Sequence, residues 1–424
     1  MNQTDKQEPR RVRHFFGELG PGLITGAADD DPSGIATYSV AGAAFGFTQL
    51  WTVFFAFPLM IAVQLMCARL GLVAGEGLAA AIRRRYPRWV LWGACALLAV
   101  SNIVNIGADL GGMAAAMEMM TGASAYLWLP LFAALIVVLL IWSSYRHIAR
   151  VFKWLTLVLF AYVAAAILAE PRWNEVLSAT FLPRIELSSH YLATFVAILG
   201  TTVSPYLFFW QTAQEVEEER AHGRRSVKAR RGATDQELRA ARTDVVTGMA
   251  FAGVVMYFII VATGATLFES GNRDIQTARD AAEALRPVAG NGAYLLFTVG
   301  LLGTGMLGIP ALAGSAAYAI AEAMHWRASL DDRPRVARKF YGVLASAVVI
   351  GLVFNYTGAN AVRMLFWAAV VNGALSAPLI VLITLLTSDK RVMGGRANTR
   401  LLRALGWITA IVMSVATAAM FVFE

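Results

Sequence analysis

Charge is scarce in this sequence, and so are the side chains that build redox and metal centres in soluble proteins. Only 15% of the 424 residues are charged, and the chain has two cysteines and five histidines. Cys67 and Cys95 lie in apolar surroundings without the spacing of a metal site, so we expect buried thiols. No Ser/His/Asp grouping, zinc-type pattern or phosphate-binding glycine loop occurs in a suitable context. We therefore expect neither an enzyme nor a bound cofactor.

Long apolar runs take up most of the chain instead. Hydrophobic residues make up 58% of the sequence, and the mean hydropathy is +0.57. A helix of about 20 apolar residues spans the hydrocarbon layer, and such runs recur about 11 times. The sequence thus predicts an all-α integral membrane protein with about 11 transmembrane helices. The predicted segments lie at 17–45, 49–73, 89–119, 125–143, 150–169, 191–213, 245–268, 292–323, 340–356, 360–387 and 402–422.

Basic residues are distributed unevenly between the loops that join these segments. A cytoplasmic N-terminus places about 29 of the 36 lysines and arginines on the cytoplasmic side, as the positive-inside rule requires. We therefore predict a cytoplasmic tail at 1–16, an external C-terminus and a location in the bacterial inner membrane, with the lipid bilayer as a partner. The net charge of +8 reflects this bias and does not indicate nucleic acid binding. The acidic run at 215–219 is interpreted as a solvated helix end.

Two of the apolar segments are interrupted by helix-breaking polar residues. Residues 29–34 read Asp-Asp-Asp-Pro-Ser-Gly, and residues 200–206 read Gly-Thr-Thr-Val-Ser-Pro-Tyr. Pro32 and Pro205 lack an N–H and disfavour helical geometry at the preceding residue. Backbone groups freed within the bilayer are costly unless protein, water or a substrate satisfies them, so unwound segments persist mainly where they line a site. A pair of broken helices in corresponding halves indicates a transporter with its binding site between them.

The spacing of the two breaks indicates an internal repeat. Because five segments separate one break from the next, the second repeat begins on the opposite side of the membrane. We predict a single transporter domain at 17–424, with inverted repeats at about 17–169 and 191–387 and an extra helix at 402–422. The aspartates of the first break have no lysine or arginine in their segment, so a cation, a proton or water must compensate their charge. A small inorganic ion is the expected substrate.

Three stretches resemble the NRAMP family of divalent-metal transporters. Gly-Pro-Gly at 20–22, followed by Asp-Pro at 31–32, resembles the Gly-Pro-Gly and Asp-Pro-Gly-Asn of the family's first helix. Residues 200–206 resemble the Gly-Ala-Thr-Val-Met-Pro-His of its sixth helix, and residues 302–318 are similar to its eighth. The resemblance implies the leucine-transporter fold, with two inverted five-helix repeats and alternating access to a site at the middle of the membrane.

The resemblance also implies roles for single residues. Asp31 matches the family's metal-binding aspartate, and Thr201 stands where a backbone carbonyl is a metal ligand. Gly34, Ser204 and Tyr206 stand where the family has asparagine, methionine and histidine. The expected substrate- or ion-binding residues are Asp31, Ser33, Gly34, Thr201, Thr202, Ser204, Tyr206 and Asn372, with Asp29, Asp30 and Asp109 as additional candidate acids.

The departures from the family pattern decide the expected cargo. A methionine thioether favours soft metals, and Ser204 removes that preference. Mg²⁺ keeps several waters and binds through one or two carboxylates, which suits the remaining ligands. Among NRAMP proteins the chain thus resembles the prokaryotic NRAMP-related magnesium transporters. We expect uptake of Mg²⁺ or another hard divalent cation without proton coupling, because Tyr206 replaces the histidine.

Two alternatives remain open on the sequence alone. The first is a proton-coupled Mn²⁺ or Fe²⁺ symporter, since Asp109 aligns with a family acid on the proton route. Separately, Asn372 falls near a family glutamine that approaches the binding site. The second is transport of an anion such as bicarbonate, with Na⁺ as the coupling ion. In that case helix N-termini and hydroxyls would hold the anion. The oligomeric state stays open.

Overall fold

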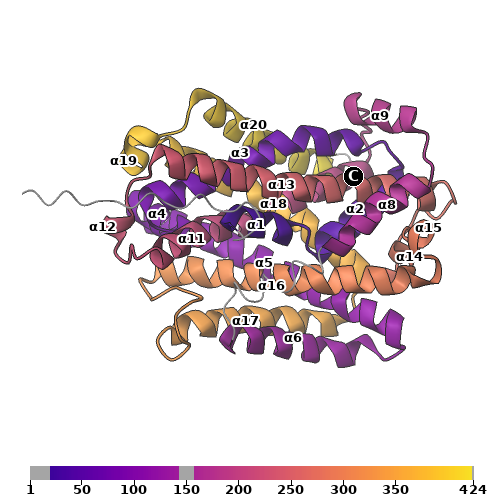
Figure 1. The fold of residues 1–424 in the computed structure, drawn as a ribbon, viewed down its shortest axis with the longest axis horizontal. Coiled ribbons are helices and arrows are strands. Elements are labelled where there is room, and N and C mark those ends of the chain that lie inside the picture. The colour runs from indigo at the N-terminus through magenta and orange to yellow at the C-terminus, as the bar shows by residue number, and fades with distance from the viewer. Residues whose placement is uncertain (1–19, 143–156, 423–424) are drawn as a thin grey trace, which may run out of the picture.

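The computed structural model describes residues 20–142 and 157–422, and every regular element within them is a helix (Figure 1). This all-helical architecture confirms the predicted fold class. The long helices run along the same general direction and form one bundle. The helices and half-helices of the bundle are α1 (Pro21–Asp29), α2 (Pro32–Phe45), α3 (Leu50–Ala74), α5 (Arg88–Thr121), α6 (Ala125–Trp142), α8 (Ala161–Leu168), α10 (Ser189–Thr202), α11 (Pro205–Ala221), α13 (Asp235–Thr263), α16 (Ala293–Ala323), α17 (Arg338–Phe354), α18 (Ala361–Ser388) and α20 (Arg400–Val422).

Short helices connect these elements at the two ends of the bundle. The α-helical connections are α4 (Leu78–Arg85), α9 (Trp173–Phe181), α12 (Val227–Arg230), α14 (Ala278–Glu283), α15 (Arg286–Ala289) and α19 (Lys390–Met393). Single turns of other helix types are η1 (Leu157–Phe160), η2 (Gly264–Phe268), η3 (Gly290–Gly292), η4 (Asn355–Thr357) and η5 (Gly394–Arg396).

The predicted membrane segments match these helices. In the described part of the chain, nine helical spans are long and apolar enough to cross a membrane. The α1–α2 pair corresponds to the first predicted segment, and the apolar stretch Leu157–Leu168 corresponds to the fifth, whose beginning lies outside the described residues. The chain is thus an integral membrane protein. Its orientation and the boundaries of the two repeats stay predictions.

Both predicted breaks are present, and each is only two residues long. The helix α1 ends at Asp29 and α2 begins at Pro32, while α10 ends at Thr202 and α11 begins at Pro205. Proline is tolerated at the first position of a helix, where the missing N–H would have no intrahelical acceptor. Each proline therefore ends one helix and starts the next within the same membrane segment.

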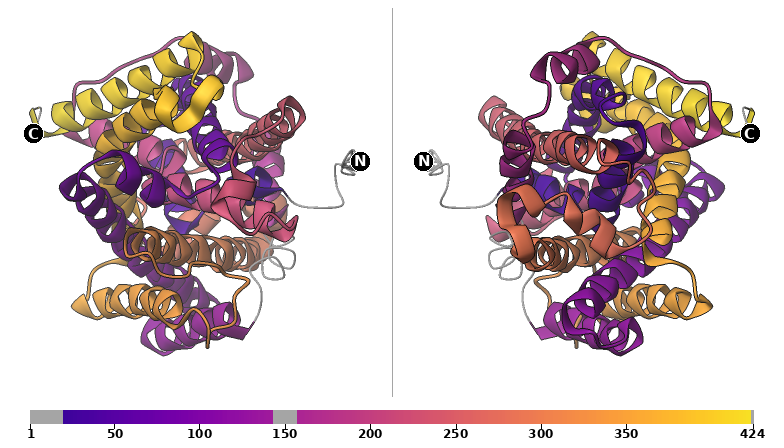
Figure 2. Two further views of the ribbon diagram at one scale, coloured as in Figure 1. Left: turned by 90° about the vertical axis from the view of Figure 1, so that its left-hand side faces the viewer. Right: turned by 90° about the vertical axis from the view of Figure 1, so that its right-hand side faces the viewer.

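Glycines bring the broken helices against their neighbours. A Cβ at Gly26 of α1 would collide with the backbone of Gly248 on α13, and one at Gly200 of α10 would collide with the backbone around Gly373 of α18. Small residues allow helix backbones to approach closely in membranes. The end-on views in Figure 2 show α20 on one side of the bundle and the α6–α17 pair on the opposite side.

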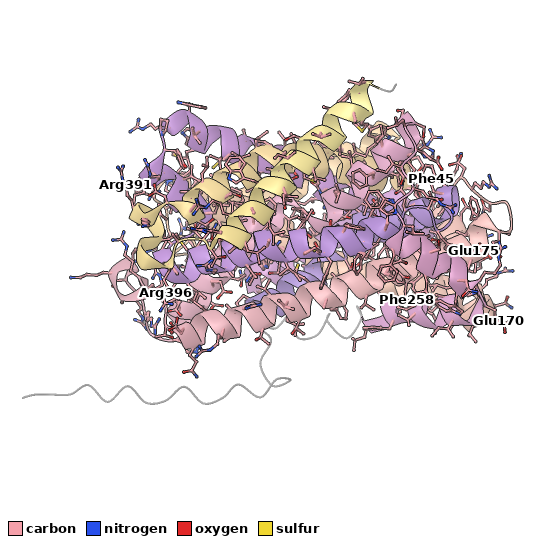
Figure 3. The ribbon with its side chains drawn as sticks, turned by 90° about the horizontal axis from the view of Figure 1, so that it is seen from above. Phe45, Glu170, Glu175, Phe258, Arg391 and Arg396 are labelled. Atoms are coloured by element: carbon pink, nitrogen blue, oxygen red, sulfur yellow. The ribbon has the colours of Figure 1, made fainter. Side chains whose placement is uncertain are left out.

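The ends of the bundle differ in their connecting segments. Figure 1 shows α4, α12 and α19 at one end and α9, α14 and α15 at the other. Figure 3 places Arg391 and Arg396 at the first end and Glu170 and Glu175 at the second. The basic connections therefore gather together, as the distribution of lysine and arginine along the sequence predicts.

The acidic run that ends α11 is not solvated, so that interpretation was wrong. Glu217 and Glu219 are buried, with 6% and 1% of their surface exposed. Glu217 pairs with Arg220 at 2.8 Å, and Arg224 reaches Glu219 at 2.6 Å from the loop that follows the helix. The basic loop folds back over the acids, which a reading of the helix alone does not reveal.

Candidate functional site

Asp31 lies at the junction of the first broken helix, where it forms the N-cap of α2. The residue is 2% exposed, and its Oδ1 accepts hydrogen bonds from the Ser33 hydroxyl at 2.6 Å and the Gly34 N–H at 2.9 Å. Aspartate is a preferred N-cap because its carboxylate accepts from N–H groups that have no intrahelical partner. The positive end of the helix dipole also stabilises its charge. The sequence Asp-Pro-Ser-Gly therefore fixes a carboxylate at the break.

Two side chains from other helices approach the second oxygen of this carboxylate. Asn105 of α5 donates through Nδ2 to Asp31 Oδ2 at 2.9 Å, and the Tyr206 hydroxyl of α11 lies 3.4 Å from the same oxygen. The Tyr206 hydroxyl donates more closely to the carbonyl of Ala28, at 2.6 Å, near the end of α1. Tyr206 thus links the two broken helices, and Asn105 brings α5 to the site.

Asp29 and Asp30 lie at the other side of the same break and lack such partners. Both are buried, and among the described residues no hydrogen-bond partner reaches any of their carboxylate oxygens. They occupy the C-terminal end of α1, where the helix dipole disfavours negative charge, whereas Asp31 occupies an N-terminus. A buried carboxylate of this kind has to be compensated by a proton, a cation or water. The three consecutive acids therefore differ, and Asp31 is the one held by donors.

Asp109 lies on α5, one helical turn beyond Asn105. It is buried, and its carboxylate oxygens have no hydrogen-bond partner of ordinary geometry in the described chain. A cavity of about 460 Å³ lies further along the same helix, with Gly111 and Glu118 among its lining residues. Along α5, Asp109 therefore lies between Asn105, which contacts Asp31, and the residues that line this cavity.

The hydroxyl groups of the second break are directed at their own helix. Thr201 and Thr202 donate to the carbonyl of Ile198 at 2.9 and 3.1 Å. Ser204 donates to the carbonyls of Gly200 and Thr201, at 2.7 and 2.8 Å. The two Ser204 bonds satisfy carbonyl groups at the C-terminal end of α10 that have no intrahelical donor. The Thr201 carbonyl, expected as a metal ligand, thus already accepts one hydrogen bond and keeps one lone pair.

A chain of hydrogen-bonded side chains connects Asn372 of α18 to Asp31. Asn372 donates through Nδ2 to the Oδ1 of Asn105 at 3.2 Å, and Asn105 in turn donates to Asp31. The Ser101 hydroxyl donates to Asn372 Oδ1. Asn372 therefore reaches the site through Asn105, a residue that the sequence analysis missed. Polar residues at 101, 105 and 109, spaced by four within an apolar segment, were the signal that could have found it.

The glycine-rich part of α16 packs directly against the first break. A Cβ at Gly308 would lie 2.9 Å from the Cβ of Asp31, and one at Gly305 would lie 3.3 Å from the Cγ of Pro32. A contact below 3.0 Å forces atoms to move, so only glycine leaves Asp31 where it is. Tight packing on α16 therefore helps to position the carboxylate.

The charged groups at the site are carboxylates, and the side chains that contact Asp31 are neutral. Among residues 20–142 and 157–422, no group of three or more histidine, cysteine, aspartate or glutamate side chains is arranged to hold a metal. The described structure instead surrounds Asp31 with a hydroxyl, a phenol and a carboxamide. Such a set suits a cation that accepts one carboxylate and neutral oxygens, with water completing its shell. Cys67 and Cys95 take no part, since both are buried free thiols.

The sequence matches the family described as natural resistance-associated macrophage protein-like, Nramp, over residues 22–423. The chain belongs to the Nramp family. Among Nramp relatives, a divalent metal cation transporter named MntH from Mesorhizobium japonicum is 28% identical over 416 residues, which cover 95% of this chain and 88% of the relative. The resemblance seen in the three sequence motifs is thereby confirmed.

Solved structures share the same architecture. A manganese transporter from Eremococcus coleocola superposes with a TM-score of 0.76 at 21% identity, over 98% of this chain and 90% of that chain. Mhp1, a transporter of the nucleobase–cation symport family, superposes with a TM-score of 0.56 at 16% identity, over 96% and 91% of the two chains. The Nramp chain therefore has the predicted leucine-transporter type of fold, and its relatives are transporters.

Proposed function

We propose that this protein transports a divalent metal cation by alternating access, with Asp31 as the charged ligand. The observation that carries the proposal is the position of Asp31, a buried carboxylate fixed at a helix break and contacted from α5 and α11. A carboxylate at this depth is costly unless it has a functional partner. Membership of the Nramp family, and relatives named as a divalent metal cation transporter and a manganese transporter, support the same cargo.

Mn²⁺ is the first candidate for the cargo and Mg²⁺ the second. The expectation of Mg²⁺ rested on Ser204, which removes a soft ligand. Carboxylate, carbonyl and water ligands, however, suit Mn²⁺ as well as Mg²⁺. The name of the Eremococcus coleocola transporter supports Mn²⁺. Mg²⁺ remains a candidate because the side chains that contact Asp31 in the described structure carry oxygen and nitrogen and no sulfur.

The donor pattern argues against a bicarbonate-type anion. An anion needs hydrogen-bond donors, yet the hydroxyls of Thr201, Thr202 and Ser204 already donate to carbonyl groups of α10. The neighbouring carboxylates of Asp29 and Asp30 would also repel it. A cation benefits from the same charges, so the cation proposal is the stronger one.

For the coupling ion we propose a proton carried by Asp109, in place of the uncoupled uptake that the missing histidine led us to expect. Asp109 is a buried acid one helical turn from Asn105, which contacts Asp31, so a dication on Asp31 disfavours a proton held on Asp109. The Tyr206 phenol is a poor proton carrier at neutral pH because a tyrosine has an ordinary pKa near 10. Its hydroxyl is also bonded to Ala28.

The deciding experiment uses the full chain in liposomes. We expect saturable Mn²⁺ uptake, with Mg²⁺ competing weakly, and acidification of the lumen measured by a trapped pH dye while valinomycin and potassium clamp the membrane potential. Asp31→Asn is the control variant and should be inactive. Uptake of bicarbonate with no uptake of either metal would refute the proposal. Uptake of Mg²⁺ in preference to Mn²⁺, without acidification, would restore the expectation drawn from the sequence.

A further inference from the structure

The first break lacks a carboxamide, and α5 places one at the same carboxylate. The residue at position 34 is glycine, whose contribution to Asp31 is its backbone N–H at 2.9 Å. Asn105 is fully buried and brings its carboxamide to the other carboxylate oxygen, Oδ2, at 2.9 Å. We propose that Asn105 is a ligand of the transported cation through its carboxamide oxygen. The inference rests on the proposed transport of a divalent cation and adds one residue to its site.

The spacing between Asn105 and Asp31 fits two neighbouring metal ligands. Ligand oxygens about 2.1 Å from an octahedral ion, at right angles to each other, lie about 3.0 Å apart. The Nδ2 of Asn105 lies 2.9 Å from Asp31 Oδ2. Because the nitrogen and oxygen of a carboxamide exchange places when the group turns by a half rotation, Oδ1 can take the position of Nδ2 without a movement of α5. The ion then binds both oxygens.

The same rotation can be accommodated by a reversal of the hydrogen bonds between Asn105, Asn372 and Ser101. Without the ion, Ser101 donates to Asn372, Asn372 donates to Asn105 at 3.2 Å, and Asn105 donates to Asp31. After reversal, Asn105 donates to Asn372 Oδ1 and Asn372 donates to Ser101 Oγ, since carboxamides and hydroxyls are each both donors and acceptors. An unpaired buried polar group costs about 1–3 kcal/mol, and the reversal avoids that cost at the two carboxamides.

The alternative role for Asn105 is to orient Asp31 as a hydrogen-bond donor only. The two roles differ in the position of the Asn105 carboxamide carbon relative to the bound ion. If Asn105 is a ligand, its carboxamide carbon is bonded to the oxygen that coordinates the metal. If Asn105 is only a donor that the ion displaces, this carbon lies farther from the metal. A paramagnetic ion reports this difference through hyperfine coupling to a labelled carbon.

The test therefore uses Mn²⁺ bound to purified full-length protein that carries ¹³C at the asparagine carboxamide. We expect electron–nuclear double resonance to show a ¹³C coupling that disappears in Asn105→Leu. The same variant should bind Mn²⁺ about 10- to 100-fold more weakly, as do losses of groups that support a metal site. If Asn105→Leu does not fold, Asn105→Asp removes the labelled group and keeps the side-chain size.

Asn102→Leu is the matched control. Asn102 is equally buried on α5, but its amide donates to the Leu312 carbonyl and the Ser315 hydroxyl of α16, both at 2.7 Å. This variant should keep the ¹³C coupling and the Mn²⁺ affinity.

Absence of the coupling in the parent protein with Mn²⁺ bound would overturn the assignment of Asn105, and so would unchanged affinity in Asn105→Leu. Either result leaves the proposed transport function intact. A parent protein that binds neither Mn²⁺ nor Mg²⁺ would instead overturn the transport proposal itself.

Discussion

Replacing Asp31 by asparagine and by alanine separates its role in the fold from its role in transport. Both variants remove the charge, so both avoid the free-energy cost of burying a carboxylate to the same extent. Asparagine keeps an oxygen for the Gly34 N–H and the Ser33 hydroxyl, and asparagine is as good an N-cap as aspartate. In Asp31→Asn the new amide can donate to the Asn105 carboxamide oxygen once that group turns by a half rotation. Alanine loses the cap, which costs about 1 kcal/mol, and leaves the buried Asn105 amide unpaired, which costs about 1–3 kcal/mol. Asp31→Ala should therefore be less stable than Asp31→Asn by about 2–4 kcal/mol.

Transport should respond differently, because both variants lack the charge that the cation requires. We expect no saturable Mn²⁺ uptake into liposomes from either protein, while Asp31→Asn melts near the parent in detergent and Asp31→Ala melts clearly lower. If the folded Asp31→Asn protein takes up Mn²⁺ with the saturation behaviour of the parent, Asp31 is not the charged ligand. Equal melting temperatures for the two variants would contradict the role of Asp31 as the N-cap of α2.

Three further variants test the packing, selectivity and coupling of the site. Gly308→Ala adds a Cβ 2.9 Å from the Cβ of Asp31, so it should cost about 1–3 kcal/mol and lower uptake at least tenfold in flux assays with correctly folded protein. Ser204→Met combined with Gly34→Asn should raise the affinity for Cd²⁺ relative to Mg²⁺ in binding titrations. A Cβ at position 34 finds ordinary contact distances of 3.4 Å or more, and unchanged selectivity would show that the added sulfur does not reach the ion. Asp109→Asn should keep Mn²⁺ binding but abolish the acidification of the liposome lumen, and acidification at the parent rate would exclude Asp109 as the proton carrier.

Local patterns in the sequence were sufficient to locate the helices and their interruptions. The apolar runs match the long helices because, in a membrane, length and hydrophobicity alone determine whether a helix can span. The breaks fell where prolines at 32 and 205 follow polar residues, because a missing N–H acts within a turn of the chain. Asp31 could be found in the same way, as a carboxylate placed one residue before a helix start.

Contacts between distant segments could not be read in this way. The acids of α11 were interpreted as solvated, but Arg224 folds back from the next loop and reaches Glu219 at 2.6 Å. Asn105 was missed because its meaning depends on Asp31, 74 positions earlier, and on Asn372, 267 positions later. The anion alternative assigned the hydroxyls of Thr201 and Ser204 to the substrate, and only the structure shows that both donate to carbonyl groups of α10.

The sequence by itself therefore determined the membrane class, the helices, the two breaks and the family, since each depends on hydrophobicity, proline geometry or a short motif within one segment. The tertiary structure alone decided which polar side chains meet at the break. Their meeting depends on the close approach of glycine-containing helices, such as α16 at Gly308, and on hydrogen bonds between α5, α11 and α18. Three adjacent aspartates look equivalent in the chain, yet only the orientation of two half-helices and their neighbours makes Asp31 the one that is held.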